Sequence, residues 1–213
     1  MRRSLSFTVL AILVVALIPS VAFGGTPIPG FGYRIGGPHS LVNYNMTDPR
    51  WANEPWGGIA GLPPMDKTAC GATSLAMVGA TLDHNRAITP VRVARNWRQV
   101  ISEGVVNWYT PHARDDISAA GRRMGLKVHN VKHNLNAVRK VVQKGGLAIA
   151  LFSTGWFTHA GHYIVIRAAS HRGFYLADPY GLGEFGHDNE DRPFTARFLE
   201  ESGVLVAAWT FTK

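Results

Sequence analysis

The sequence has 213 residues, of which 46% are hydrophobic and 17% are charged, and its formal net charge is +8 at pH 7. This length favours one domain with a substantial hydrophobic core and is short for two. The basic residues are scattered and form no continuous run, so much of the charge belongs to solvated helix surface, and we predict no nucleic-acid partner. In an exported chain, a basic surface favours anionic polymers of the cell envelope or acidic peptides.

The first 24 residues have the organisation of a secretory signal peptide. Arg2 and Arg3 precede an apolar run over residues 7–18, and a small-residue cleavage site follows. The apolar run is too short for a comfortable transmembrane helix, which needs about 20 residues. We therefore expect cleavage after Ala22 or Gly24 and a secreted or periplasmic protein without a stable membrane span. An uncleaved anchor is the alternative.

The next part of the chain predicts an arm followed by helices. Residues 25–39 are rich in glycine and proline and have little periodicity, which indicates an N-terminal arm or loop ahead of one domain over 40–213. A short strand over 41–46 and a turn at Asp48-Pro49 come next. Apolar spacing and terminal proline or glycine residues then predict four helices, over 70–82, 90–104, 111–125 and 135–145.

Strands dominate the rest of the chain. The segment 126–128 alternates like a strand, and apolar runs bounded by Gly, Ser and Asp-Pro predict further strands over 147–152, 162–168, 174–177 and 204–211. Most helices precede the sheet instead of alternating with its strands. This order predicts an α+β domain.

Cys70 is the single cysteine and lies at the start of the predicted helix 70–82. Leu75, Val78, Gly79 and Leu82 form one stripe of this helix that would face the core. Unpaired N–H groups and the helix dipole at its first turn would stabilise a thiolate, the nucleophilic form of cysteine. The alternative is a small buried hydrophobic residue. A lone cysteine in an exported chain cannot form an internal disulfide, which favours a chemical use.

A cysteine nucleophile needs a base and a group that orients the base, and His162 and Asp178 suit these roles by position. His162 opens one predicted strand, and Asp178 closes the next, so a hairpin would bring them together. Each has a structural alternative, since Asp-Pro is common in turns. His159 suggests a zinc site with His162, but no cluster of thiols or carboxylates joins them. We predict no metal and no cofactor.

Four segments resemble a known family: Asp48-Pro-Arg-Trp-Ala-Asn53, Ala69-Cys-Gly-Ala-Thr-Ser-Leu-Ala-Met-Val78, Gly161-His-Tyr163 and Ala177-Asp-Pro-Tyr180. They are similar to the motifs of papain-like cysteine peptidases related to the double-glycine leader peptidases of bacteriocin exporters, in the stand-alone exported branch. The resemblance spans residues 40–180. It implies a papain-like cysteine peptidase fold over 40–213, with Cys70 as nucleophile, His162 as general base and acid, and Asp178 as the orienting carboxylate.

One position departs from the pattern of that family. The family usually places a glutamine two residues before the Asp-Pro as a donor to the oxyanion hole, and here that position is Met46. Methionine cannot donate a hydrogen bond, and loss of one such donor typically lowers turnover by about 10²–10³. Either Asn45 is re-aimed into the site, or the backbone N–H of Cys70 acts nearly alone, or the protein no longer cleaves a bond.

Three functions are therefore open at the level of sequence. The first is an exported cysteine peptidase that acts on a peptide or isopeptide bond of a peptide or protein substrate, which could be associated with the cell envelope. The second is a papain-like module that binds peptides without turnover, motivated by Met46. The third is an amidase or transacylase acting on cell-wall peptides, which the basic charge would suit.

Overall fold

The computed structural model describes residues 25–27, 33–35, 40–102, 116–181, 183, 189 and 192–213. The predicted signal peptide, most of the predicted arm and Pro111, expected to open a helix, lie outside these residues. Within the arm, β1 (Gly25–Pro27) and β2 (Tyr33–Ile35) pair antiparallel with each other and β2 pairs with β3 (Leu41–Asn43). Part of the arm is therefore a small sheet instead of a loop, and β3 is shorter than the predicted strand.

The helical half of the chain follows β3. Its elements are the 3-10 turn η1 (Trp56–Gly58) and the helices α1 (Met65–Thr68), α2 (Cys70–Leu82), α3 (Pro90–Ser102) and α4 (Asp116–Arg123). The last three confirm predicted helices. Helix α4 ends at Arg123, two residues before its predicted end, whereas the predicted end of α3 and start of α4 lie outside the described residues. η1 and α1 were not predicted because each is about one turn long and has no apolar period to detect.

The second half forms one six-stranded antiparallel sheet in the order β4-β9-β5-β6-β7-β8. The strands are β4 (Lys127–Lys132), β5 (Leu147–Phe152), β6 (His162–Ser170), β7 (Gly173–Ala177), β8 (Pro193–Phe194) and β9 (Leu205–Thr212), with α5 (Leu135–Val142) and α6 (Ala196–Glu201) between them. The predicted strands and α5 are confirmed, whereas the short β8 and α6 were missed. Within the described ranges, no helix is both long and apolar enough to span a membrane.

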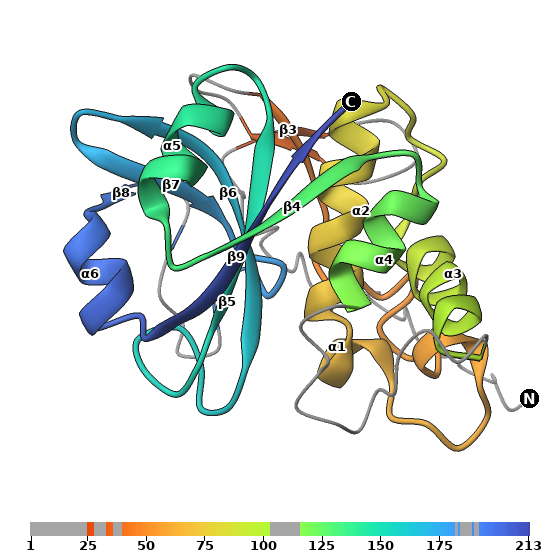
Figure 1. The fold of residues 1–213 in the computed structure, drawn as a ribbon. Helices are drawn as coiled ribbons and strands as arrows, with labels where there is room; N and C mark the ends of the chain where they lie inside the picture. Colours follow the sequence, from red (N-terminus) through yellow and green to blue (C-terminus); the bar gives the residue numbers. More distant parts are fainter. Residues whose placement is uncertain are drawn as a thin grey trace, which may run out of the picture.

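Helices cover both faces of this sheet. Figure 1 shows α2, α3 and α4 on one side and α5 and α6 on the other. Alternate residues of β5 enter the two cores: Ile149 packs with the residues of α2, whereas Ala148 and Phe152 pack with those of α5. Because both faces of β5 are covered, its sequence is a continuous apolar run. The architecture is α+β, as predicted.

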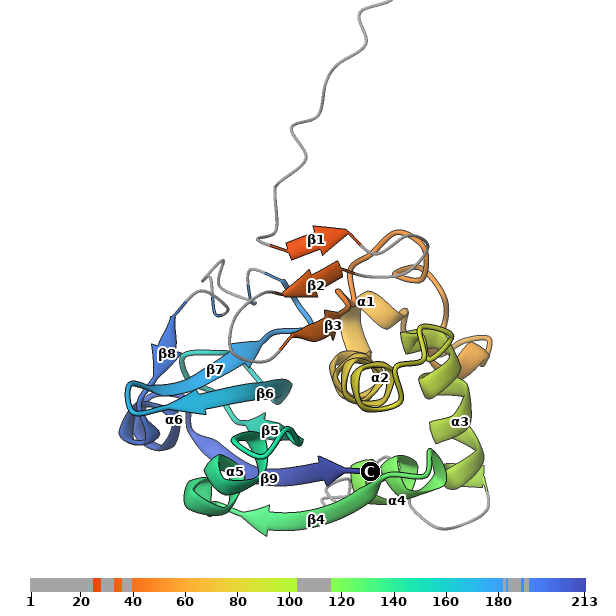
Figure 2. The same ribbon diagram turned by 90° about the horizontal axis from the view of Figure 1, so that it is seen from above.

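Helix α2 is surrounded by other elements. It packs against β3, α3, α4, β5 and β6, and Figure 2 shows it between the small sheet, α3 and the large sheet. Every residue from Gly71 to Ala80 is buried, so the prediction of a single core-facing stripe is wrong. Small residues allow neighbouring elements to approach the helix closely: a Cβ atom at Gly79 would lie 2.4 Å from Met124 Cε. The site is thus built on a rigid central helix.

Candidate active site

Cys70 is the first residue of α2, as predicted, and it is half-buried. It lines a cleft, whereas Leu75 and Val78 of the same helix are fully buried in the core. The preceding residue, Ala69, has non-helical backbone angles and provides no side-chain cap. The N–H groups of the first turn are therefore not occupied by a capping side chain, and they and the helix dipole favour negative charge at the sulfur.

His162 is the first residue of β6 and only 6% exposed. A hydrogen bond from Ser74 Oγ to the carbonyl oxygen of Tyr163, 3.0 Å long, ties α2 to the beginning of β6. Ser74 lies one turn beyond Cys70 on the helix, so this bond holds the strand that carries His162 beside the turn that carries Cys70.

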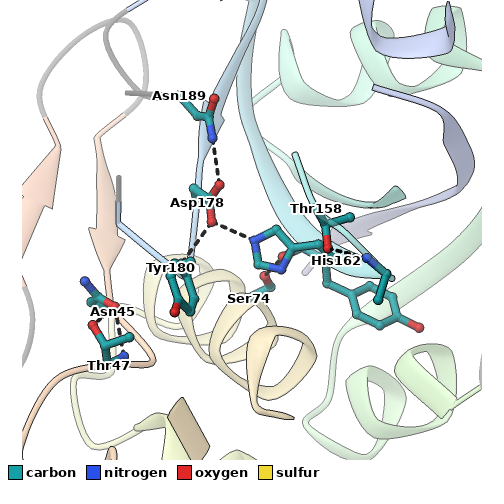
Figure 3. A network of polar contacts seen from close by, with 10 residues as sticks. Asn45, Thr47, Ser74, Thr158, His162, Asp178, Tyr180 and Asn189 are labelled. Carbon is teal, nitrogen blue, oxygen red and sulfur yellow. Dashed lines mark hydrogen bonds and ion pairs between the residues drawn. The ribbon is translucent and has the colours of Figure 1, made fainter. Parts of the chain in front are cut away.

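Asp178 directly follows β7, and the β6–β7 hairpin brings it beside His162. Val165 pairs with Ala177 across this hairpin. His162 Nε2 lies 2.7 Å from Asp178 Oδ1, and Asp178 is 1% exposed (Figure 3). Because Nε2 is engaged by the carboxylate, Nδ1 is the ring nitrogen left for Cys70. The structure thus brings together all three residues that the sequence singled out.

The charges of this group support one another. Burial alone lowers the pKa of His162, but the charge and hydrogen bond of Asp178, with a smaller contribution from Cys70, raise it to about 10. Burial alone raises the pKa of the Cys70 thiol, whereas the hydrogen bond and charge of His162 and the backbone N–H groups of Tyr163 and Gly71 bring it below its ordinary value. The geometry therefore favours a thiolate beside an imidazolium, titrating as a coupled pair.

A fourth polar residue, Asn189, completes the group and was not predicted. Its Nδ2 donates to Asp178 Oδ2 at 2.8 Å, and the backbone N–H of Tyr180 donates to Asp178 Oδ1 at 2.9 Å. Asn189 belongs to a stretch rich in glycine and acidic residues that has no helical or strand period. No spacing rule applied to the sequence could connect it with Asp178.

The segment with Asp48-Pro49 positions one wall of the cleft. Arg50 Nη2 forms an ion pair with Asp48 Oδ2 at 2.6 Å, and its charge and hydrogen bonds outweigh burial and lower the pKa of Asp48. The buried Trp51 donates from Nε1 to the carbonyl oxygen of Asn45 at 2.8 Å. Met46 N–H donates to Pro179 O at 2.7 Å, which fixes Met46 against the turn that follows Asp178.

The cleft around Cys70 has a volume of about 200 Å³. Its lining residues are Met46, Asp66, Lys67, Cys70, Thr158, Ala160, Gly161, His162 and Tyr180. Asn45 is not among them, because its Oδ1 accepts from both the N–H and the hydroxyl of Thr47, at 2.9 and 2.8 Å (Figure 3). The sequence left two candidate hydrogen-bond donors to the oxyanion, the backbone N–H of Cys70 and the Asn45 side chain. The structure favours the backbone N–H of Cys70.

A second, larger cavity of about 410 Å³ lies at the other end of α2. Leu82, His84, Lys144 and Lys213 are among its lining residues, and the described residues that line it include no cysteine and no carboxylate. Volume alone therefore does not identify the reactive site. Among the described residues we find no group of three or more His, Cys, Asp or Glu side chains suited to a metal ion, and His159 is exposed.

The fold and the site together define a class. A cysteine at the start of a central helix faces a histidine and an aspartate on adjacent strands of an antiparallel sheet, which is the α+β, papain-like cysteine peptidase fold. Residues 50–202 match the model of the Peptidase_C39 like family. The chain belongs to this family, and membership supports a function of the cysteine peptidase type.

Two solved structures are similar to the chain at low sequence identity. A structure described as a C39-like peptidase from Bacillus anthracis has 12% identity and a TM-score of 0.47, and the match covers 81% of this chain and 94% of that one. The Pseudomonas avirulence protein AvrPphB has 10% identity and a TM-score of 0.41, with 69% and 93% covered. No curated protein matches the chain.

Proposed function

We propose that the protein is an exported cysteine peptidase that hydrolyses a peptide or isopeptide bond, with Cys70 as nucleophile, His162 as general base and acid, and Asp178 as the orienting carboxylate. One observation carries this proposal. The buried ring of His162 binds Asp178 through Nε2 and lies against the Cys70 sulfur, whose pKa is lowered, in a cleft that can admit a substrate.

The proposed reaction has two stages. The Cys70 thiolate attacks the carbonyl carbon, and the carbonyl electron pair moves to the oxygen, where the backbone N–H of Cys70 donates a hydrogen bond. The tetrahedral intermediate collapses, and the C–N bond breaks as His162 protonates the leaving amine. A water molecule then gives a proton to His162 and attacks the thioester. This second stage releases the carboxylic acid product and regenerates the thiolate–imidazolium pair.

We also propose that the reaction takes place outside the cytoplasm. Residues 1–24 have the pattern of a cleavable signal, so we place the enzyme outside the cytoplasm, in the stand-alone exported branch of its family. Without Arg2 and Arg3 the proposed mature chain keeps 20 Lys and Arg against 14 Asp and Glu, and this net charge of +6 suits a peptide or protein substrate associated with an anionic cell envelope. The proposed chemistry requires no cofactor, since the side chains of Cys70 and His162 perform the attack and both proton transfers.

Cleavage profiling of a peptide library, with purified sacculi included as a separate substrate, tests the function. Wild type should yield hydrolysis products, and Cys70→Ala should yield none. Products from the sacculi and none from the peptide library would favour the cell-wall amidase or transacylase. Equal cleavage by wild type and Cys70→Ala would show that Cys70 is not the nucleophile.

A non-catalytic peptide-binding module is the second candidate, and Met46 favours it. This buried side chain lines the cleft beside Cys70 and cannot donate to an oxyanion. Titration with a thiol-alkylating reagent separates the two functions, because a binding module has no need of a fast-reacting thiolate. Slow alkylation together with peptide binding and no products would favour the module.

A further inference from the structure

Asn189 is a buried residue whose side-chain amide binds the Asp178 carboxylate. The residue is 1% exposed, and its Nδ2 donates to Asp178 Oδ2 at 2.8 Å, on a different carboxylate oxygen from the one that binds His162 (Figure 3). Its own Oδ1 is also buried and has no hydrogen-bond partner among the described residues. If the amide were flipped, Asn189 Oδ1 would face the Asp178 carboxylate, and two acceptors would repel each other. The amide nitrogen must therefore be the atom that faces Asp178.

The two oxygens of Asp178 have separate partners. Oδ1 accepts from His162 Nε2 and from the N–H of Tyr180, and Oδ2 accepts from Asn189. Without Asn189, a buried carboxylate oxygen would be left unpaired, and the carboxylate would be free to turn toward another donor. The contact between Oδ1 and His162 depends on that orientation. Asn189 thus satisfies Asp178, while its own Oδ1 has no partner in the part of the chain that the structure describes.

We propose that Asn189 is a positioning residue that holds the Asp178 carboxylate in the orientation in which it binds His162 Nε2 and directs His162 Nδ1 to Cys70. This inference rests on the proposed function, because it assigns Asn189 a place in the same Cys-His-Asp group. Asn189 acts through Asp178 and does not line the cleft. Its loss should therefore change the ionisation of the Cys70–His162 pair rather than the affinity for substrate.

Other titratable groups lie near this pair and must be kept constant. Asp66 and Lys67 of α1 line the cleft as an ion pair of 3.1 Å, Tyr180 lines it from the turn after β7, and the exposed His159 precedes β6. All four remain in every variant below. A difference in pH profile between these variants therefore reports on Asp178 and its partners.

The test is the pH dependence of Cys70 alkylation by iodoacetamide in the full chain, which requires no substrate. Asn189→Leu removes the donor at similar volume, and Asn189→Asp sets a second carboxylate against Asp178. We expect the acid limb of the profile to move up by about one pH unit in Asn189→Leu, which is about tenfold slower alkylation at pH 6. The shift should be larger in Asn189→Asp.

Two further variants guard against a general loss of folding. Asn189→Ala removes the donor without adding bulk or charge and leaves the Asp178 carboxylate in place, so it should move the acid limb up as Asn189→Leu does. Asn134→Ala is the matched control: it removes an asparagine whose Oδ1 accepts from Ala137 N–H at 2.9 Å at the start of α5, remote from the site. It should leave the profile unmoved.

The outcomes separate this inference from the function it rests on. A wild type that alkylates no faster than a free thiol at pH 6 would refute the proposed nucleophile. A fast wild type, with profiles unchanged in both Asn189→Leu and Asn189→Asp, would overturn the positioning role alone. Should both of these variants fail to fold, Asn189→Ala decides, since a folded Asn189→Ala whose acid limb has moved up supports the role and one with the wild-type profile refutes it.

Discussion

The exchange of Met46 for glutamine is the most informative change in the cleft. Met46 is 3% exposed, lines the cleft with Cys70 and is held by the bond from its N–H to Pro179 O. Glutamine has nearly the same length, so its amide would enter the cleft from the same wall. It adds a donor where the wild type has a thioether that cannot donate.

The size of the effect follows from what one donor contributes. Removal of one oxyanion donor typically costs about 10²–10³ in turnover. A donor introduced without other adjustments should recover the lower part of that effect, so we expect Met46→Gln to raise turnover at least about tenfold, or about 1.4 kcal/mol of transition-state stabilisation. An amide left unpaired in the free enzyme would cost about 1–3 kcal/mol, so the melting temperature should fall by several degrees.

The assay is turnover of a slow peptide substrate by wild type, Met46→Gln, Met46→Leu and Asn45→Ala. Met46→Leu matches the volume without a donor and should show no gain. Asn45→Ala should have a smaller effect than Met46→Gln, since the Asn45 side chain is held in its own turn by Thr47 and does not line the cleft. No gain in Met46→Gln together with a large loss in Asn45→Ala would refute this reasoning. An absence of turnover in all of these proteins would favour the binding module.

Three further predictions concern the reactive group. Cys70 should alkylate at pH 6 at least about tenfold faster than a free thiol, and His162→Ala should slow it, because the imidazolium stabilises the thiolate; equal rates would remove His162 from the site. Asp178→Ala should lower turnover about a hundredfold or more and reduce activity more than thermal stability, whereas failure to fold at the expression temperature would indicate a turn-forming role. The pKa of His162 is raised to about 10 in the folded protein, against about 6.5 for an unperturbed histidine in the unfolded chain. Protonation of the ring therefore stabilises the fold fully below about pH 6.5, and this stabilisation is lost as the pH rises through about 10. Between these two pH values the melting temperature should fall more in wild type than in His162→Gln, and equal falls in the two proteins would contradict the raised pKa.

Local patterns predicted most of the elements because helices and strands have periods that can be read over a few residues. The spacing of apolar residues located α2, α3 and α5, and apolar runs located β5, β6, β7 and β9. Elements of one turn or two residues, such as α1 and β8, carry too few residues to show a period. The burial of every residue of α2 from Gly71 to Ala80 was missed because glycine and alanine positions do not reveal in advance which neighbours will approach them.

The sequence by itself determined the chemical types and approximate places of Cys70, His162 and Asp178, since each stands at the end of an element that local patterns delimit. The tertiary structure alone decided which atoms meet. It assigned Nε2 of His162 to Asp178, held the Asn45 side chain in its own turn and brought Asn189 onto Asp178 Oδ2. The contacts of Asp178 with His162 and Asn189 join residues whose separation follows no period, and they form only when distant parts of the chain pack together. The contact of Asn45 with Thr47 is a local turn, but only the structure shows that it keeps Asn45 out of the cleft lining.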